Sequence, residues 1–324
     1  MTAAVLDAPV VVASHRQSAT EVLGIDVSTA PSAHDALIHA GIAGLNVRKV
    51  GIRTDRGKRI PTQFGLELHD GTPLPVTVGA GFEVVQYETN ADLLDAVSRR
   101  LEAPFGRAGG LVAHKGRAFL TMDLPEPIRI GDDFLAASLT AFMGHGRTGN
   151  HFVPGAMRVG CFNQQTHLMR EGRDHMVTIR HTSSAPERTA VAEETLVATM
   201  TGIKELAAEG NEMVAAKVTD DQFWAIVNQI YPLGGSSKAA ETRHDRRVES
   251  IENLRDAPHN ANIRGTAWGT YQVLNEYSQW AQNIRAGLDG EQVARARRAL
   301  ISGNLHATQA RTYTAVRELV GLAA

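Results

Sequence analysis

Basic residues gather on one predicted hairpin near residue 50. Residues 47–59 hold six cations and a single acid, Asp55. Lys49 and Arg53 share one face of the predicted strand, and the hairpin tip that follows is also basic. Cations spaced in this way can follow the phosphates of a nucleic acid without reading its sequence. The alternative is a solvated hairpin with polar outer positions and no ligand.

A second basic segment lies between residues 147 and 188, which contain six arginines and three acids. The segment that follows, residues 191–221, carries seven acids and only two lysines. The formal charge of the 324 residues is only −2, but basic and acidic residues are concentrated in different segments. A uniformly basic surface is excluded, whereas a local basic face is not.

Histidines and one cysteine could support a different chemistry. His145, His151 and His181 would have to converge from separate strands and loops, and no H-E-x-x-H or two-His-one-carboxylate spacing is present. We expect exposed or hydrogen-bonded histidines rather than metal ligands. Cys161 alternates with Met157 and Val159, which predicts a small core residue on a buried strand face.

Several classes of protein are excluded by what the sequence lacks. There is no G-x-G-x-x-G, Walker-type or G-x-S-x-G motif, so no cofactor and no catalytic residue is predicted. One cysteine rules out a disulfide framework and multi-cysteine metal sites. No apolar run approaches the ~20 residues of a membrane span, and the first residues lack signal-peptide character. We expect a cytoplasmic protein without membrane contact.

The elements that would position these residues change in type along the chain. Residues 1–30 show no sustained period and are interpreted as a flexible arm. Short helices are predicted at Ser32–His39 and Asn90–Glu102. Period-two alternation and turn residues predict antiparallel strands. These strands are Val47–Thr54, Ile60–Leu68, Leu74–Val78 (at a sheet edge because of its prolines), Leu111–His114, Arg117–Asp123, Leu135–Met143, Ala156–Phe162 and Met176–His181.

Helical periodicity dominates after Ser184, where capping boxes are predicted at Ser184 with Glu187 and at Thr219 with Gln222. Later helices are expected near 244–256, 267–287, 290–301 and 304–320. The predicted fold class is therefore α+β, an antiparallel β-meander core with packed helices followed by a helical C-terminal region. The predicted organisation is an arm at 1–30, a core domain at 31–232 and a helical region at 238–324.

The order of several motifs resembles a phage- and plasmid-borne family known as a domain of unknown function (number nine-three-two). The motifs are Gly81-Phe-Glu-Val-Val-Gln86, Met143-Gly-His-Gly-Arg-Thr-Gly149, Met157-Arg-Val-Gly-Cys-Phe-Asn163, Ile179-Arg-His-Thr182, Gly265-Thr-Ala-Trp268 and Asn275-Glu-Tyr277. The resemblance covers roughly residues 32–310. Where many members have an acid, this chain has Gly144-His145-Gly146.

In outline the predicted architecture is similar to the phage single-strand annealing recombinases. That resemblance implies a nucleotide-independent, homo-oligomeric protein that holds single-stranded DNA in a basic groove. It implies phosphate contacts on the hairpin from Arg48, Lys49, Arg53, Lys58 and Arg59. It implies an inner groove lined by Arg147, Arg158 and Arg180. Arg158 could face either solvent or a buried carboxylate, and strand alternation favours solvent.

Two other classes stay open at this point. One is a phage regulatory or assembly protein that binds only other proteins. The other is a metal-assisted or thiol hydrolase built from the side chains of His145, His151, Cys161, Asn163 and His181.

Overall fold

The structure is a computed structural model that describes residues 16–111, 116–145, 150–165, 177–179, 185–285, 288–301 and 303–322. Its largest element is an antiparallel sheet in which the strand order is β1-β5-β6-β8-β9-β10, with β7 paired to β8. These strands are β1 (Ile25–Asp26), β5 (Phe105–Leu111), β6 (Arg117–Asp123), β7 (Ile128–Ile130), β8 (Asp133–Gly144), β9 (Asn150–Arg158) and β10 (Val177–Ile179). The predicted α+β class with an antiparallel meander is confirmed.

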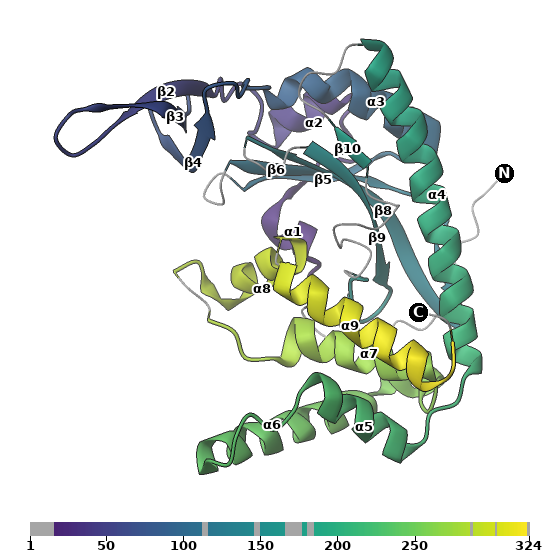
Figure 1. Cartoon of the computed structure of the whole chain (residues 1–324). Coiled ribbons are helices and arrows are strands. Elements are labelled where there is room, and N and C mark those ends of the chain that lie inside the picture. Colours follow the sequence, from purple (N-terminus) through teal and green to yellow (C-terminus); the bar gives the residue numbers. More distant parts are fainter. Residues whose placement is uncertain are drawn as a thin grey trace.

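A second, three-stranded sheet extends away from the main sheet (Figure 1). It consists of β2 (Arg48–Arg53), β3 (Arg59–Glu67) and β4 (Pro73–Gly79), with β3 in the centre. The edge position predicted for the proline-containing strand is confirmed. A small core of its own, including Leu66 and Leu74, supports this sheet. We call residues 48–79 the hairpin arm.

Residues 16–30 are more ordered than the sequence indicated. Residues 1–15 lie outside the described part of the chain, but residues 16–30 do not form a loose arm. Ser18 and Glu21 make a complete capping box at the start of α1 (Ala19–Leu23). β1 then pairs with β5, and Val27 is fully buried. A helix of five residues is too short to show a period, which explains why the sequence pattern missed it.

One face of the main sheet packs against α2 (Ala33–His39), α3 (Ala91–Leu101) and α4 (Ala185–Ala215), which runs along the sheet (Figure 1). The predicted apolar stripe of α3 is buried, including Leu93, Leu94 and Val97. Ser32 caps α2 as expected, because its side chain accepts a hydrogen bond from the backbone N–H of Asp35. The short helix η1 (Tyr87–Asn90) leads into α3. The capping box predicted at Ser184 lies outside the described residues.

The opposite face packs against α1, α8 (Gly290–Ile301) and the start of α9 (Gly303–Leu319). Phe119 and Phe142, which are register partners on β6 and β8, form the sheet side of this contact. The sheet is therefore covered by helices on both faces, and its side chains are buried in two separate apolar layers.

The remaining helices close the end of the sheet. They are α5 (Asp220–Ile230), with the predicted Thr219 capping box, α6 (Lys238–Arg255), η3 (Pro258–Ile263), α7 (Ala267–Glu276) and a π-helical turn η4 (Tyr277–Ala281). One hydrophobic cluster joins Leu135 of β8, Met213 of α4 and Trp268 of α7. The hydrophobic core thus crosses the predicted boundary at 232–238. None of the described helices has the length and apolar character needed to cross a membrane.

Candidate functional site

Most of the predicted hairpin cations lie on the surface of the arm, but several already have protein partners. Arg48 forms an exposed ion pair with Glu67, at 2.6 Å between Nη2 and Oε1. The Nζ of Lys49 donates to the carbonyls of Ala80 and Phe82 at 2.7 and 2.8 Å. These bonds connect β2 to the end of β4, so the amine has a structural role on the arm.

The tip of the hairpin is more open. Arg53 donates from Nη1 to the carbonyl of Gly57 at 2.9 Å and stabilises the turn. Arg56, Lys58 and Arg59 are exposed, and in the described part of the chain none of them has an ion-pair partner. The tip therefore presents three cations to solvent.

An aromatic ring lies beside these cations. The Lys49 amine lies 5.1 Å from the centroid of the Phe64 ring, and the Arg59 guanidinium lies 5.9 Å from it. Phe64 is only partly buried. Part of the ring packs against the small core of the arm, and the rest lies beside the two cations. Bases of single-stranded nucleic acids stack on partly exposed aromatic rings that have cations beside them.

Arg158 is not on the surface, and the prediction that it faces solvent is wrong. It is 3% exposed and shares a sheet face with its register partner Leu135, which is fully buried. Its Nε and Nη2 atoms bind Asp133 bidentately at 2.7 and 2.8 Å, and Nη2 also donates to the carbonyl of His259 at 2.7 Å. An arginine held in this way cannot line an open groove. Arg147 and Arg180 lie outside the described residues.

Asp133 connects the sheet to the C-terminal helices. Its Oδ2 accepts the indole N–H of Trp268 at 2.9 Å, and its Oδ1 accepts the side-chain amide of Asn262 at 2.8 Å. Together with Arg158, these donors satisfy a carboxylate that is 6% exposed.

A buried amide network continues from this ion pair along α7. Gln165 and Gln272 exchange side-chain hydrogen bonds at 3.2 and 3.4 Å. The side chain of Gln279 accepts from the backbone N–H of Gln164 at 3.1 Å and donates to its carbonyl at 2.8 Å. Asn275 also donates to that carbonyl at 3.1 Å. The segment after β9 is thus held by side chains more than 100 residues away in sequence.

Glu276 is the most deeply buried charge of this network, at 0% exposed. It accepts from His259 Nε2 at 2.9 Å and from the amide of Asn260 at 3.2 Å, and it forms an ion pair with Arg16. Burial by itself raises the pKa of a carboxyl, but the bonds and charges of His259 and Arg16 outweigh it and hold the pKa of Glu276 below its ordinary value.

The lowered pKa of Glu276 predicts a pH-dependent contribution to stability. A carboxylate whose folded pKa is depressed stabilises the fold above its ordinary pKa of 4.5, and the contribution is lost as pH falls through the folded pKa. We expect Glu276→Gln to be destabilising at pH 7, with a difference from wild type that shrinks below about pH 4.5. Urea unfolding between pH 7 and pH 3.5 measures this difference in the free energy of unfolding. Glu318→Gln, on the exposed end of α9, is the control, and a pH-independent Glu276→Gln effect would contradict the assignment.

In the hypothesis of a metal-assisted or thiol hydrolase, Cys161 is the candidate nucleophile, and its position in the structure does not suit that role. Cys161 is 1% exposed, as predicted for a core residue, and burial raises the pKa of its thiol to about 11. A thiol with that pKa stays protonated at neutral pH. His145 stacks on Tyr87 and His151 on Phe142, with ring centroids 4.4 and 5.4 Å apart. His181 lies outside the described residues, within which no cluster of metal-ligating side chains forms.

Sequence reasoning missed the buried polar network, although one signal was available. Every residue of α7 is buried, yet the helix and its π turn carry Thr270, Gln272, Asn275, Glu276, Ser278 and Gln279. The solvated face of a helix usually carries charged residues, and their scarcity in α7 is the signal that its polar side chains are buried against a polar partner. The sequence could not name that partner, which is the segment following β9.

The fold and this network define a class of α+β proteins in which an antiparallel sheet lies between two helical layers, and a buried Arg–Asp–Trp cluster joins the sheet to the helices that close its end. Residues 76–300, more than half of the chain, match the family described as Domain of unknown function (DUF932), and the chain belongs to that family. Neither a curated protein nor a solved structure matches the chain. Arg158, Trp268 and Glu276 lie within the matched residues, whereas strands β2 and β3 of the hairpin arm precede them.

Proposed function

We propose that this protein binds single-stranded DNA along the hairpin arm and anneals it to a complementary strand during recombination, without a nucleotide cofactor. The observation that carries the proposal is the cation-rich tip of an arm that stands away from the main sheet (Figure 1). In this proposal the protein is a cytoplasmic homo-oligomer encoded by phages or plasmids.

The charge of the arm supports a polyanionic partner. Residues 48–67 contain six cations and only two acids, and one of those acids is already paired with Arg48. Because the arm projects, its cations are not neutralised by the acidic stretch of α4, which packs along the sheet. A projecting cationic hairpin can contact successive phosphates of a flexible strand.

The Phe64 ring supports a single strand rather than a duplex. Bases of single strands are free to stack on aromatic side chains, whereas those of a duplex are stacked on each other. Arg59, which lies beside the ring and is exposed, is placed to contact the phosphate next to a stacked base. Such contacts tolerate any sequence, as annealing requires.

The test is binding of a fluorescent 30-nucleotide strand at several salt concentrations. The variant Arg56→Ala/Lys58→Ala/Arg59→Ala removes the three tip cations that have no hydrogen-bond role on the arm. If each contacts one phosphate, the slope of log affinity against log salt becomes shallower by about 2, and the strand binds more weakly at low salt.

A matched control removes three exposed cations from another surface. Lys238→Ala/Arg243→Ala/Arg246→Ala on α6 has the same change in net charge and is expected to leave the salt slope close to wild type. An arm variant that binds like wild type would contradict the proposal, as would a folded wild-type protein that does not bind at low salt. The second result would favour a protein that binds only other proteins.

A further inference from the structure

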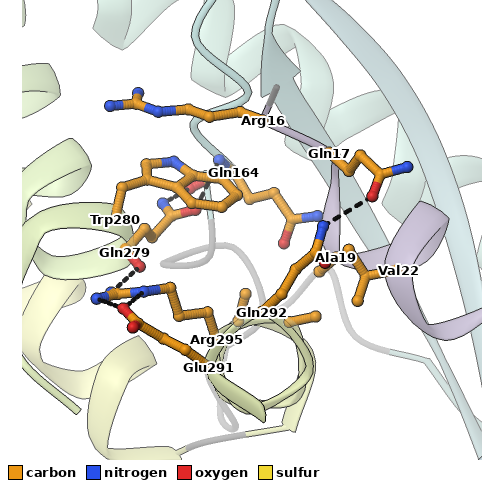
Figure 2. A pocket seen from close by; sticks show the side chains of 12 residues that line it. Arg16, Gln17, Ala19, Val22, Gln164, Gln279, Trp280, Glu291, Gln292 and Arg295 are labelled. Atoms are coloured by element: carbon orange, nitrogen blue, oxygen red, sulfur yellow. Dashed lines mark hydrogen bonds and ion pairs between the residues drawn. The ribbon is translucent and has the colours of Figure 1, made fainter. Parts of the chain in front are cut away.

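Two cavities of the molecule share Gln164 on their linings. The larger, of about 580 Å³, lies between α1, η4 and α8 (Figure 2). Both of its arginines are already paired with carboxylates, Arg16 with Glu276 and Arg295 with Glu291. The smaller cavity, of about 360 Å³, lies between α1 and the face of the main sheet that packs against α1 and α8. We call this smaller one the sheet cavity.

The floor of the sheet cavity is a polar patch made of two register pairs. Thr121 of β6 pairs with Thr140 of β8, and Asp123 of β6 pairs with Ser138 of β8. Alternation places these four residues on one face of the sheet, and all four line the cavity. On β9, Gly155 is the register partner of Ser138 and has no side chain to fill the space above the sheet. The floor is therefore both hollow and polar.

Thr140 brings an unsatisfied hydroxyl group to this floor. It is 2% exposed, and its side chain forms no hydrogen bond with the described part of the chain. Its register partner Thr121 is buried to a similar degree, at 3%, but the Thr121 hydroxyl accepts the backbone N–H of Arg107 at 2.7 Å. Leaving a buried hydroxyl without a hydrogen bond is costly. A ligand in the sheet cavity would supply the missing bond.

Acidic side chains outnumber basic ones around the cavity. The lining holds Glu21, Asp26 and Asp123 and, among the described residues, one cation, Arg107. Arg107 lies 3.8 Å from both Glu21 and Asp26, whereas the Asp123 carboxylate forms no hydrogen bond or ion pair with the described residues. Burial raises the pKa of Asp123, which Arg107 opposes and Asp26 reinforces. Three acids against one arginine leave an excess of negative charge that favours a cationic ligand.

The arrangement suits an organic cation better than a metal ion. No group of three metal-ligating side chains forms within the part of the chain that the structure describes. Asp123 and Thr140 are diagonal neighbours on adjacent antiparallel strands, which places such side chains roughly 7–8 Å apart. An ammonium group has three donors and no acceptor, so it can bind either a carboxylate or a hydroxyl oxygen. A short chain with an ammonium group at each end can therefore reach both residues.

We propose that the sheet cavity binds a short aliphatic diamine, such as putrescine. One ammonium group pairs with the carboxylate of Asp123, and the other donates to the hydroxyl of Thr140. Glu21 and Asp26 add to the negative potential that attracts the ligand. This inference does not rest on the function proposed for the hairpin arm.

The experiment is calorimetric titration of the full chain, in the absence of nucleic acid, with putrescine, 4-amino-1-butanol and 1,4-butanediol. The three compounds have the same carbon chain and carry two, one and no ammonium groups. We expect putrescine to bind, and each replacement of an ammonium group by a hydroxyl to weaken binding at least about tenfold, because a hydrogen bond to a charged group is replaced by a neutral one.

Two variants test the assigned contacts. Asp123→Asn removes the charge and Thr140→Val removes the hydroxyl, and each keeps the shape of the side chain. Each is expected to weaken putrescine binding about tenfold. Thr140→Val should not lower the free energy of unfolding, because the hydroxyl makes no hydrogen bond that the protein would lose. Asp245→Asn and Thr242→Val, at exposed positions of α6, are the matched controls and should bind putrescine like wild type.

The inference is overturned if the wild-type chain does not bind putrescine, or if 1,4-butanediol binds as well as putrescine. It is also overturned if putrescine binding is unchanged in folded Asp123→Asn and Thr140→Val. Binding of Mg²⁺ without binding of putrescine would point to a metal site instead. The arm variant Arg56→Ala/Lys58→Ala/Arg59→Ala should bind putrescine like wild type, so failure of this inference is distinguishable from failure of the proposed function.

Discussion

Replacing Arg158 by methionine is expected to lower the free energy of unfolding by about 3–5 kcal/mol, because the change leaves a buried carboxylate without its cation. Arg158 supplies two of the hydrogen bonds to Asp133, and both side chains are nearly inaccessible to solvent. Methionine fills much of the same volume, so the effect reports the unpaired charge rather than a cavity. Chemical unfolding at pH 7, followed by circular dichroism, measures it.

A control separates burial from ion pairing as such. Arg48→Met also removes an arginine from an ion pair, but that pair with Glu67 is exposed, and we expect a loss below about 1 kcal/mol. In the double variant Asp133→Asn/Arg158→Met no buried charge is left unpaired, so its loss should be smaller than the sum of the two single losses. If Arg158→Met and Arg48→Met lowered the free energy of unfolding equally, the buried pair would stabilise the fold no more than an exposed pair does. That result would contradict its role in joining the sheet to the helices.

Trp268→Ala should destabilise the protein by a similar amount, about 3–5 kcal/mol, because the ring is completely buried in the cluster that joins β8, α4 and α7. Trp268→Phe keeps an aromatic ring but leaves Asp133 with one donor fewer. We expect that variant to lose about 1–3 kcal/mol, the cost of an unmade bond to a buried polar group. Thermal and urea unfolding of both variants check the difference.

Trp224→Ala provides the comparison, since that ring on α5 is only partly buried and has a smaller role in the same cluster. Trp224→Ala should lower the free energy of unfolding clearly less than Trp268→Ala does. Trp268 and Arg158 share Asp133, so Trp268→Phe and Arg158→Met should couple in a double-mutant cycle. Additive losses would contradict a shared contact at Asp133.

The hairpin arm shows how far the sequence could predict a candidate site. Alternation on both sides of the Asp55–Lys58 turn predicted the two strands, and β2 and β3 pair as expected. The sequence also predicted that the tip cations lie on the surface, because residues beside a polar turn are rarely buried in a core. The hydrogen bonds of Lys49 to Ala80 and Phe82 could not be predicted, since they depend on the path of the chain after β4.

Arg158 shows where local pattern failed. Alternation separates the two faces of a strand but does not say which face is covered. Val159, expected inside, is 55% exposed, and Arg158, expected outside, is buried. Burial of the arginine depends on Asp133, 25 residues earlier, and on the backbone of His259, 101 residues later. No local pattern contains those partners.

The sequence by itself determined the features that rest on neighbouring residues: the capping of α2 and α5, the buried stripe of α3, the hairpin and the antiparallel α+β class. The tertiary structure alone decided that α7 would end in a π turn, and that Arg158 would be buried against Asp133. The physical reason is that caps, turns and periodic stripes are satisfied within a few residues. Buried charges and amides need partners that only the folded chain brings together.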